Sequence, residues 1–112
     1  MRYSKYKAKK TIVNGIEFDS KKEANRYATL LLLEKSGRIK NLKLQPTYEL
    51  IPKFKKNDKT YRKTTYKADF EYFDTKLNKT IVEDVKGFKT DIYKLKKKMF
   101  EYKYNELEIE EV

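Results

Sequence analysis

Residues 66–86 read YKADFEYFDTKLNKTIVEDVK, and this segment decides the fold. Aromatic and β-branched residues alternate with charged ones on both sides of a polar stretch at 75–78, a pattern typical of two antiparallel strands joined by a short turn. A loop of this length places Asp74 opposite Lys79, and each earlier pair along the two strands follows from that one. The segment therefore predicts a hairpin with a defined register.

The same register brings chemically active side chains together. It places Asp69 opposite Asp84, with Cβ atoms about 5 Å apart, and it places Lys67 opposite Lys86. Asp84 and Lys86 are two residues apart on one strand, so they share a face. Two carboxylates this close repel each other unless they share a cation, and oxygen ligands without His or Cys suit Mg²⁺ or Mn²⁺. We therefore predict a divalent metal site at Asp69 and Asp84 with Lys86 beside it; a plain ion pair between Asp69 and Lys86 is the structural alternative.

Glu83 faces the other side of the predicted hairpin. There it lies beside the strand face that carries Tyr66, Phe70 and Tyr72, and it needs a Tyr hydroxyl, a Lys or a water molecule as partner. A β-bulge in either strand would shift the alternation and exchange Glu83 with Asp84. The register therefore decides which acid belongs to the metal site.

The flanking sequence predicts two helices and further strands. In chain order these are a hairpin at 11–18 around Asn14-Gly15, a helix from Ser20 to Gly37, a strand at 39–50 interrupted near Gln45-Pro46, a polar connection at 52–60, a strand at 61–73, a strand at 80–86, a helix from Asp91 with an apolar stripe of Ile92, Leu95, Met99 and Tyr102, and a strand at 107–110. The last strand follows a helix, so it is expected to return parallel through a right-handed crossover. This order predicts an α/β (α+β) fold in which helices flank a mixed sheet.

The composition limits the possible functions. The chain has 112 residues, no Cys, no His and a formal net charge of +11. Its length fits one domain, which we assign to residues 11–112 after a basic N-terminal arm at 1–10. Without Cys or His, catalysis would depend on carboxylates, Lys, Tyr or hydroxyls. The apolar runs are too short for a membrane span or a signal peptide, so we expect a soluble protein of the cytoplasm.

The positive charge is concentrated in three segments. Residues 1–10, 53–67 and 86–98 are rich in Lys and Arg, whereas the last seven residues hold four Glu and no base. Such clustering favours a nucleic acid as the binding partner over a membrane, and over a role in solubility alone. Lys and Arg side chains that neutralise phosphates release the counterions bound there. A lysine-rich helix face can also be merely solvated. The residues expected to contact DNA are Lys67, Lys89, Tyr93, Lys94 and Lys97.

Four motifs resemble the PD-(D/E)XK nuclease superfamily, whose restriction-endonuclease-like core is αβββαβ. They are FDSKKEA at 18–24, LQP at 44–46, YKADF at 66–70 and VEDVKG at 82–87. The chain is most similar to small, uncharacterised phage-encoded proteins of that superfamily, and the likeness covers nearly its whole length. The resemblance implies metal ligands at Asp69 and Asp84, a further acidic ligand at Glu23 and a catalytic Lys at Lys86.

The chain departs from the motif at one position, and two other positions leave alternatives open. Ala68 stands where the motif has its Pro, which is not a ligand. Glu23 also fits a capping box with Ser20, in which each side chain bonds the backbone N–H of the other residue. Gln45 is either a polar residue of the catalytic site or a bend residue before Pro46.

The resemblance implies a Mg²⁺-dependent DNA endonuclease that hydrolyses phosphodiester bonds. Small basic members of the superfamily resemble Holliday junction resolvases and other structure-specific phage nucleases, which act on branched or duplex DNA in recombination as homodimers. A non-catalytic DNA-binding or recombination accessory protein on the same fold is the first alternative. An RNA-associated basic module is the second, although no RNA-binding signature accompanies the aromatic residues.

Overall fold

The computed structural model describes residues 10–85 and 89–112, so most of the expected basic N-terminal segment at 1–10 lies outside the described residues, as does Lys86. The described elements form a mixed α+β fold, as predicted. Their bounds are β1 (Thr11–Val13), β2 (Ile16–Phe18), α1 (Lys21–Lys35), β3 (Ile39–Leu44), β4 (Thr47–Ile51), β5 (Phe54–Lys56), β6 (Lys59–Tyr61), β7 (Thr64–Lys67), β8 (Phe70–Asp74), β9 (Lys79–Asp84), α2 (Asp91–Lys103) and β10 (Ile109–Glu111). Neither described helix is long and apolar enough to cross a membrane.

Local sequence signals account for the N-terminal elements. Asn14 and Gly15 take φ angles of 54° and 79°, which is the backbone that a two-residue turn between β1 and β2 requires. Ser20 caps α1, because its hydroxyl accepts the backbone N–H of Glu23 at 3.1 Å. Gly37 follows the helix at a φ of 83°, so the predicted end of the helix is also confirmed.

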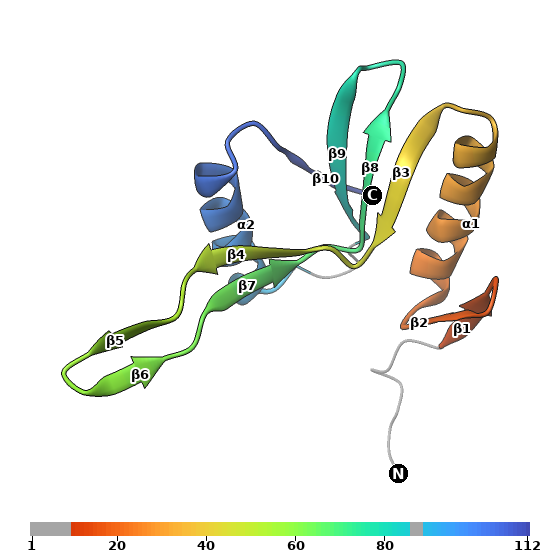
Figure 1. Ribbon diagram of the computed structural model, residues 1–112. Coiled ribbons are helices and arrows are strands. Elements are labelled where there is room, and N and C mark those ends of the chain that lie inside the picture. Colours follow the sequence, from red (N-terminus) through yellow and green to blue (C-terminus); the bar gives the residue numbers. More distant parts are fainter. Residues whose placement is uncertain (1–9, 86–88) are drawn as a thin grey trace, which may run out of the picture.

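One four-stranded sheet forms the centre of the molecule in the order β10-β9-β8-β3. β10 runs parallel to β9, as expected for a strand that returns after a helix, and the other neighbours are antiparallel. Figure 1 shows the sheet between the two helices. The buried residues of α1 pack with one face of the sheet and those of α2 with the other, in two separate hydrophobic clusters.

The predicted register of the central hairpin is confirmed. Asp74 pairs with Lys79, and the ladder continues to Phe70 opposite Glu83. Beyond that pair, the backbone N–H of Asp69 donates to the Glu83 carbonyl oxygen at 3.1 Å. The side chains of the two strands therefore alternate between the faces as expected up to Asp69 and Asp84.

The expected single strand at 61–73 is interrupted, and this corrects one assignment of faces. β7 ends at Lys67 and pairs with β4, whereas β8 begins at Phe70 and pairs with β3 and β9. Tyr66 consequently lies in the cluster beside α2, whereas Phe70 and Tyr72 lie in the cluster beside α1. The bend at Asp69, between β7 and β8, interrupts the alternation, so the three aromatic residues do not share one face.

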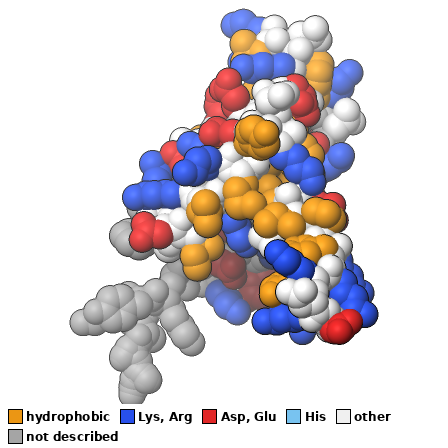
Figure 2. Space-filling view, turned by 90° about the vertical axis from the view of Figure 1, so that its left-hand side faces the viewer, with side chains coloured by type: hydrophobic (Ala, Val, Ile, Leu, Met, Phe, Trp, Pro, Cys, Tyr) orange, Lys and Arg blue, Asp and Glu red, His pale blue; other side chains and the backbone are white. Residues whose placement is uncertain are grey.

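The apolar stripe expected on α2 is wrong at three of its four positions; the fourth residue, Met99, is partly buried and packs against the cluster beside α2. Ile92, Leu95 and Tyr102 are exposed, whereas Tyr93 and Phe100 are the buried residues of the helix. Two aromatic residues seven positions apart lie on one helix face, and each large ring buries much apolar area against the sheet. Figure 2, which looks onto the side that carries α2, shows the resulting surface: hydrophobic side chains exposed among Lys and Arg.

The polar connection expected at 52–60 contains a hairpin instead. β5 pairs with β6, and the turn between them is Asn57-Asp58, with φ angles of 52° and 62°. Asn and Asp tolerate this left-handed backbone better than other non-glycine residues, so two polar residues form a tight turn here. β4 pairs with β7 at the base of this hairpin, and together they form a two-stranded extension, which we call the arm (residues 47–67) (Figure 1).

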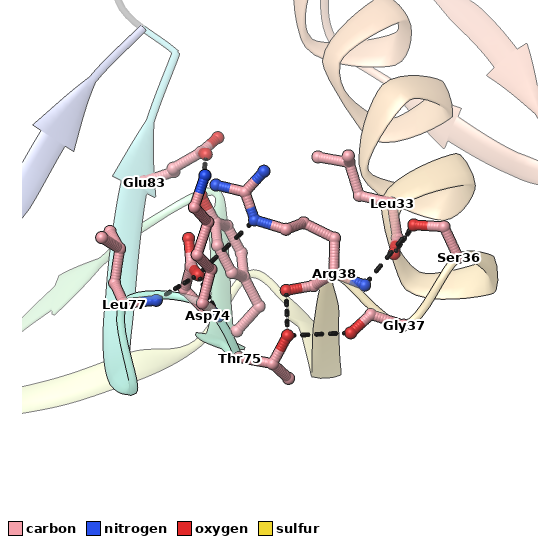
Figure 3. A network of polar contacts seen from close by, with 10 residues as sticks. Leu33, Ser36, Gly37, Arg38, Asp74, Thr75, Leu77 and Glu83 are labelled. Atoms are coloured by element: carbon pink, nitrogen blue, oxygen red, sulfur yellow. Dashed lines mark hydrogen bonds and ion pairs between the residues drawn. The ribbon is translucent and has the colours of Figure 1, made fainter.

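The turn between β8 and β9 is held by Asp74. Its Oδ1 atom accepts the backbone N–H groups of Lys76 and Leu77, both at 2.9 Å, and lies 3.7 Å from Nε of Arg38. The Thr75 hydroxyl bonds the carbonyl oxygens of Gly37 and Arg38, also at 2.9 Å (Figure 3). Hydrogen bonds within the turn and contacts to Gly37 and Arg38, in the segment after α1, thus both stabilise it. The N–H of Leu77, then that of Lys76 and the Arg38 charge, hold the pKa of Asp74 below its usual value.

Replacing Asp74 with Ala should lower the melting temperature, because the two N–H groups lose their acceptor. The lowered pKa means that the contribution is complete above the ordinary value of 3.8 and is lost as the pH falls through the lower folded value. The difference in melting temperature between wild type and Asp74→Ala, measured by circular dichroism, should therefore be large at pH 7 and shrink below pH 3.8. Lys76→Ala, in the same turn, should have little effect. Equal melting temperatures for wild type and Asp74→Ala at neutral pH would contradict the assignment.

Candidate functional site

Asp69 and Asp84 meet at one end of the central hairpin. Asp69 directly precedes β8, and Asp84 is the last residue of β9. Asp84 is fully buried and Asp69 is partly buried, and the two side chains interact electrostatically. Oδ2 of Asp69 accepts the backbone N–H of Val85 at 2.7 Å, which turns the carboxylate toward the end of β9. The convergence of the two acids predicted from the register is therefore present.

Burial and like charge both act on Asp69. Burial, together with the neighbouring Asp84 and Glu23, raises the pKa of Asp69 to about 7, and the Val85 N–H opposes the shift. Removing solvent from a carboxylate and placing a second acid beside it disfavour the charged form. A cation at this point would reverse both effects, since it favours the charged form of every carboxylate around it.

Tyr66 holds Asp84 from the α2 side of the sheet. Its phenol O–H donates to Oδ2 of Asp84, and the pKa of Tyr66 is raised by burial and by that hydrogen bond. The phenol is therefore a proton donor throughout the ordinary pH range and orients the carboxylate. Tyr66 was not among the predicted site residues, because the expected alternation put it on the opposite face from Asp84.

Glu23 keeps both interpretations open: the half of the capping box that Ser20 makes is present, and the role of metal ligand stays a prediction. It lies in the first turn of α1 and is buried, and its backbone N–H takes part in the cap with Ser20. Its charge also acts on Asp69, so the helix brings a third carboxylate near the pair. In the described part of the chain, no set of three or more acids is arranged to hold a metal ion by itself.

Gln45 lies at the bend between β3 and β4. Its backbone takes a φ of 51°, and its N–H donates to the carbonyl oxygen of Asp69 at 2.9 Å. The side chain is exposed. Gln45 is therefore a bend residue that borders the site through its backbone.

Glu83 occupies a separate polar cluster on the α1 side of the sheet. It is fully buried and accepts hydrogen bonds from Nε of Arg26 at 2.8 Å, from Nη2 of Arg26 and from the Tyr72 hydroxyl. The expected Tyr hydroxyl partner is confirmed in Tyr72, but Arg26 was missed. Its position three residues after Glu23, on the same helix face, was the available signal. Glu83 is fully engaged away from Asp69, which leaves Asp84 as the acid of β9 at the site.

The residues expected to contact DNA differ in their surroundings. Glu111 of β10 binds Lys89 at 2.9 Å, Lys97 at 3.5 Å and the Tyr93 hydroxyl at 2.7 Å. The hydrogen bonds from Lys89 and then Tyr93 lower the pKa of Glu111 to about 2. Tyr93 is buried among apolar residues of α2 and the sheet. The two remaining candidates, Lys67 and Lys94, are exposed.

Replacing Arg26 with Leu should destabilise the fold, because it leaves the buried Glu83 charge without its cation. The expected loss in the free energy of unfolding is about 3 kcal/mol, at the low end of the range for a broken buried pair because Arg26 keeps part of its side chain in solvent. Lys35→Leu, at an exposed site on the same helix, should change it little. Adding Glu83→Gln to Arg26→Leu should recover part of the loss in urea denaturation; strictly additive losses would show that the two residues are not coupled.

Comparisons with curated proteins and with solved structures found no match to this chain. A family model described as "Protein of unknown function (DUF1064)" matches residues 3–112. The match covers both acids of the site, both helices and the arm. The chain therefore belongs to the DUF1064 family of proteins of unknown function.

Proposed function

We propose that this protein is a Mg²⁺-dependent endonuclease that hydrolyses phosphodiester bonds in DNA. The observation that carries the proposal is the meeting of Asp69 and Asp84 at the end of the central hairpin, with Asp84 fully buried and Glu23 close enough to act on Asp69. Two interacting acids, one fully and one partly buried, are costly unless they bind a cation. The order of α1, antiparallel strands, α2 and parallel β10 is consistent with a PD-(D/E)XK core.

The donor set suits Mg²⁺ or Mn²⁺. Both ions favour carboxylate oxygens, and Mg²⁺ is commonly held by one or two carboxylates together with water and substrate phosphate. Asp69 and Asp84 would hold the ion, and Glu23 would support it from α1. When bound, the ion would lower the pKa of a coordinated water molecule and offset the charge that develops on the phosphate.

The protein's own groups would position the reaction. The Tyr66 hydroxyl orients the Asp84 carboxylate, and the Val85 N–H orients that of Asp69. Such contacts restrict the ligands before substrate arrives, which is how a supporting shell contributes to a metal site. Lys86, which lies outside the described residues, is proposed from the sequence as the cation that balances charge on the phosphoryl group.

The charge of the chain supports DNA as substrate. A formal net charge of +11 and dense Lys and Arg segments favour contacts to phosphates, which position a protein without reading sequence. Recognition of DNA shape, as in branched or duplex substrates of phage recombination, fits this kind of contact. A homodimer would allow both strands to be cut.

Asp69→Asn, Asp84→Asn and Lys86→Met should each abolish cleavage, whereas Glu83→Gln should retain it. The two Asp changes remove charge from the proposed ligands, and Glu83 lies on the other face with Arg26 and Tyr72. The measurement is cleavage of supercoiled plasmid, linear duplex and a four-way junction in Mg²⁺, in Mn²⁺ and with chelator. Circular dichroism controls for folding of each variant.

The decisive comparison is between neighbouring acids. Loss of activity in folded Glu83→Gln with retention in Asp84→Asn would sink the proposal, as would chelator-resistant cleavage. Binding of the same DNA in Ca²⁺ without cleavage in Mg²⁺ or Mn²⁺ would favour the accessory protein instead.

A further inference from the structure

The arm leaves the molecule directly beside the candidate site. At its base, the Ala68 N–H donates to the Pro46 carbonyl at 3.0 Å, and the Gln45 N–H donates to the Asp69 carbonyl at 2.9 Å. From there β4 and β7 run outward as a pair and continue into the β5–β6 hairpin (Figure 1). At a strand rise of about 3.3 Å per residue, the turn at 57–58 lies roughly 35 Å from Asp69 along the arm.

The outer half of the arm is exposed and basic. Every residue from 51 to 63 is exposed, and Asp58 is the single acid among them. Its bases are Lys53, Lys55, Lys56, Lys59, Arg62 and Lys63. A two-stranded hairpin with no core beneath it is marginal in stability, so its composition need not serve packing.

One face of this hairpin groups two lysines with two aromatic rings. Phe54 pairs with Tyr61, and their rings stack with centroids 4.8 Å apart while remaining 44% and 39% exposed. Lys56 lies directly opposite Lys59, whose Nζ is 5.1 Å from the Tyr61 ring centroid. The ring pair stabilises the hairpin, but like charges directly opposite each other destabilise it. A bound polyanion would turn that repulsion into attraction.

We propose that the arm is a DNA-binding element that lies in a groove of the duplex adjoining the cleavage site. The inference rests on the proposed function in taking DNA as the ligand. A two-stranded ribbon fits the major groove, which is about 12 Å wide, and lysines at its edges reach the phosphates on either side. With roughly 35 Å between site and tip, and a rise of about 3.4 Å per base pair, the arm spans about ten base pairs. The arm thus sets how much duplex beside the site the protein engages.

The test uses the full chain in Ca²⁺ and measures binding to fluorescent DNA by anisotropy over a range of salt. Lys56→Gln/Lys59→Gln should weaken binding to a duplex of about 30 base pairs by roughly tenfold and reduce the log–log salt slope by about 2, because each lost phosphate contact changes it by about 1. Lys76→Gln/Lys79→Gln is the matched control, since it removes two lysines at the turn of the other long hairpin. On a duplex of about 8 base pairs, too short to reach the tip, the arm variant should bind like wild type.

Several outcomes overturn the proposal. These are equal affinity and slope for the arm variant and the control, a loss confined to single-stranded DNA, and a change of oligomeric state in sedimentation with DNA affinity unchanged. If duplex binding depends on the arm but no substrate is cleaved, the proposed nuclease function is wrong and the proposed role of the arm stands. If cleavage needs Asp84 but not the arm, the proposed role of the arm is wrong and the nuclease function stands. If the wild-type protein does not bind DNA, both proposals are wrong.

Discussion

The register of β8 against β9 is the constraint on which the rest of the structure depends. Because side chains alternate with a period of two, a slip by one residue would move every side chain of a strand to the other face. Here the slip would send Glu83 toward Asp69 and Asp84 toward Arg26. Asp74, which holds the turn through two backbone N–H groups and lies beside Arg38, sets the first pair of the ladder.

Given that register, the sheet carries a buried carboxylate on each face with different partners. Glu83 meets a cation and a phenol, Arg26 and Tyr72, so its charge is compensated within the protein. Asp84 meets the Tyr66 phenol and a second acid, Asp69. The phenol orients the Asp84 carboxylate but carries no positive charge to offset the two acids. The same strand end therefore has one acid that is paired with a cation of the protein and one acid whose neighbour is a second acid, which is the pair that the proposed function uses.

The interruption at 68–69, opposite the bend at Gln45-Pro46, joins the site to the arm. The segments 39–51 and 64–74 pair with each other on both sides of this point, as β3 with β8 and as β4 with β7. Within the described part of the chain, β8 also pairs with β9 and belongs to the central sheet, whereas β4 and β7 form a separate pair. A Pro at 46 donates no hydrogen bond to a ladder, and Gln45 takes a left-handed backbone, so the regular sheet ends there. The acids consequently lie at the junction of a rigid sheet and a projecting basic ribbon.

The sequence by itself determined what depends on neighbours along the chain. The Asn14-Gly15 turn, the Ser20 cap, the end of α1 near Gly37, the pairing of Asp74 with Lys79 and the convergence of Asp69 with Asp84 all follow from short-range geometry and a period of two. The parallel return of β10 followed from the rule for crossovers. Tertiary structure alone decided which face of α2 is buried, since that depended on the aromatic surface offered by Tyr48 and Tyr66 to Phe100. It also decided that Tyr66 meets Asp84 and that Arg26 meets Glu83, because these contacts join residues on different elements. No local pattern specifies how a helix is rotated against a sheet or where a pair of strands bends out of one.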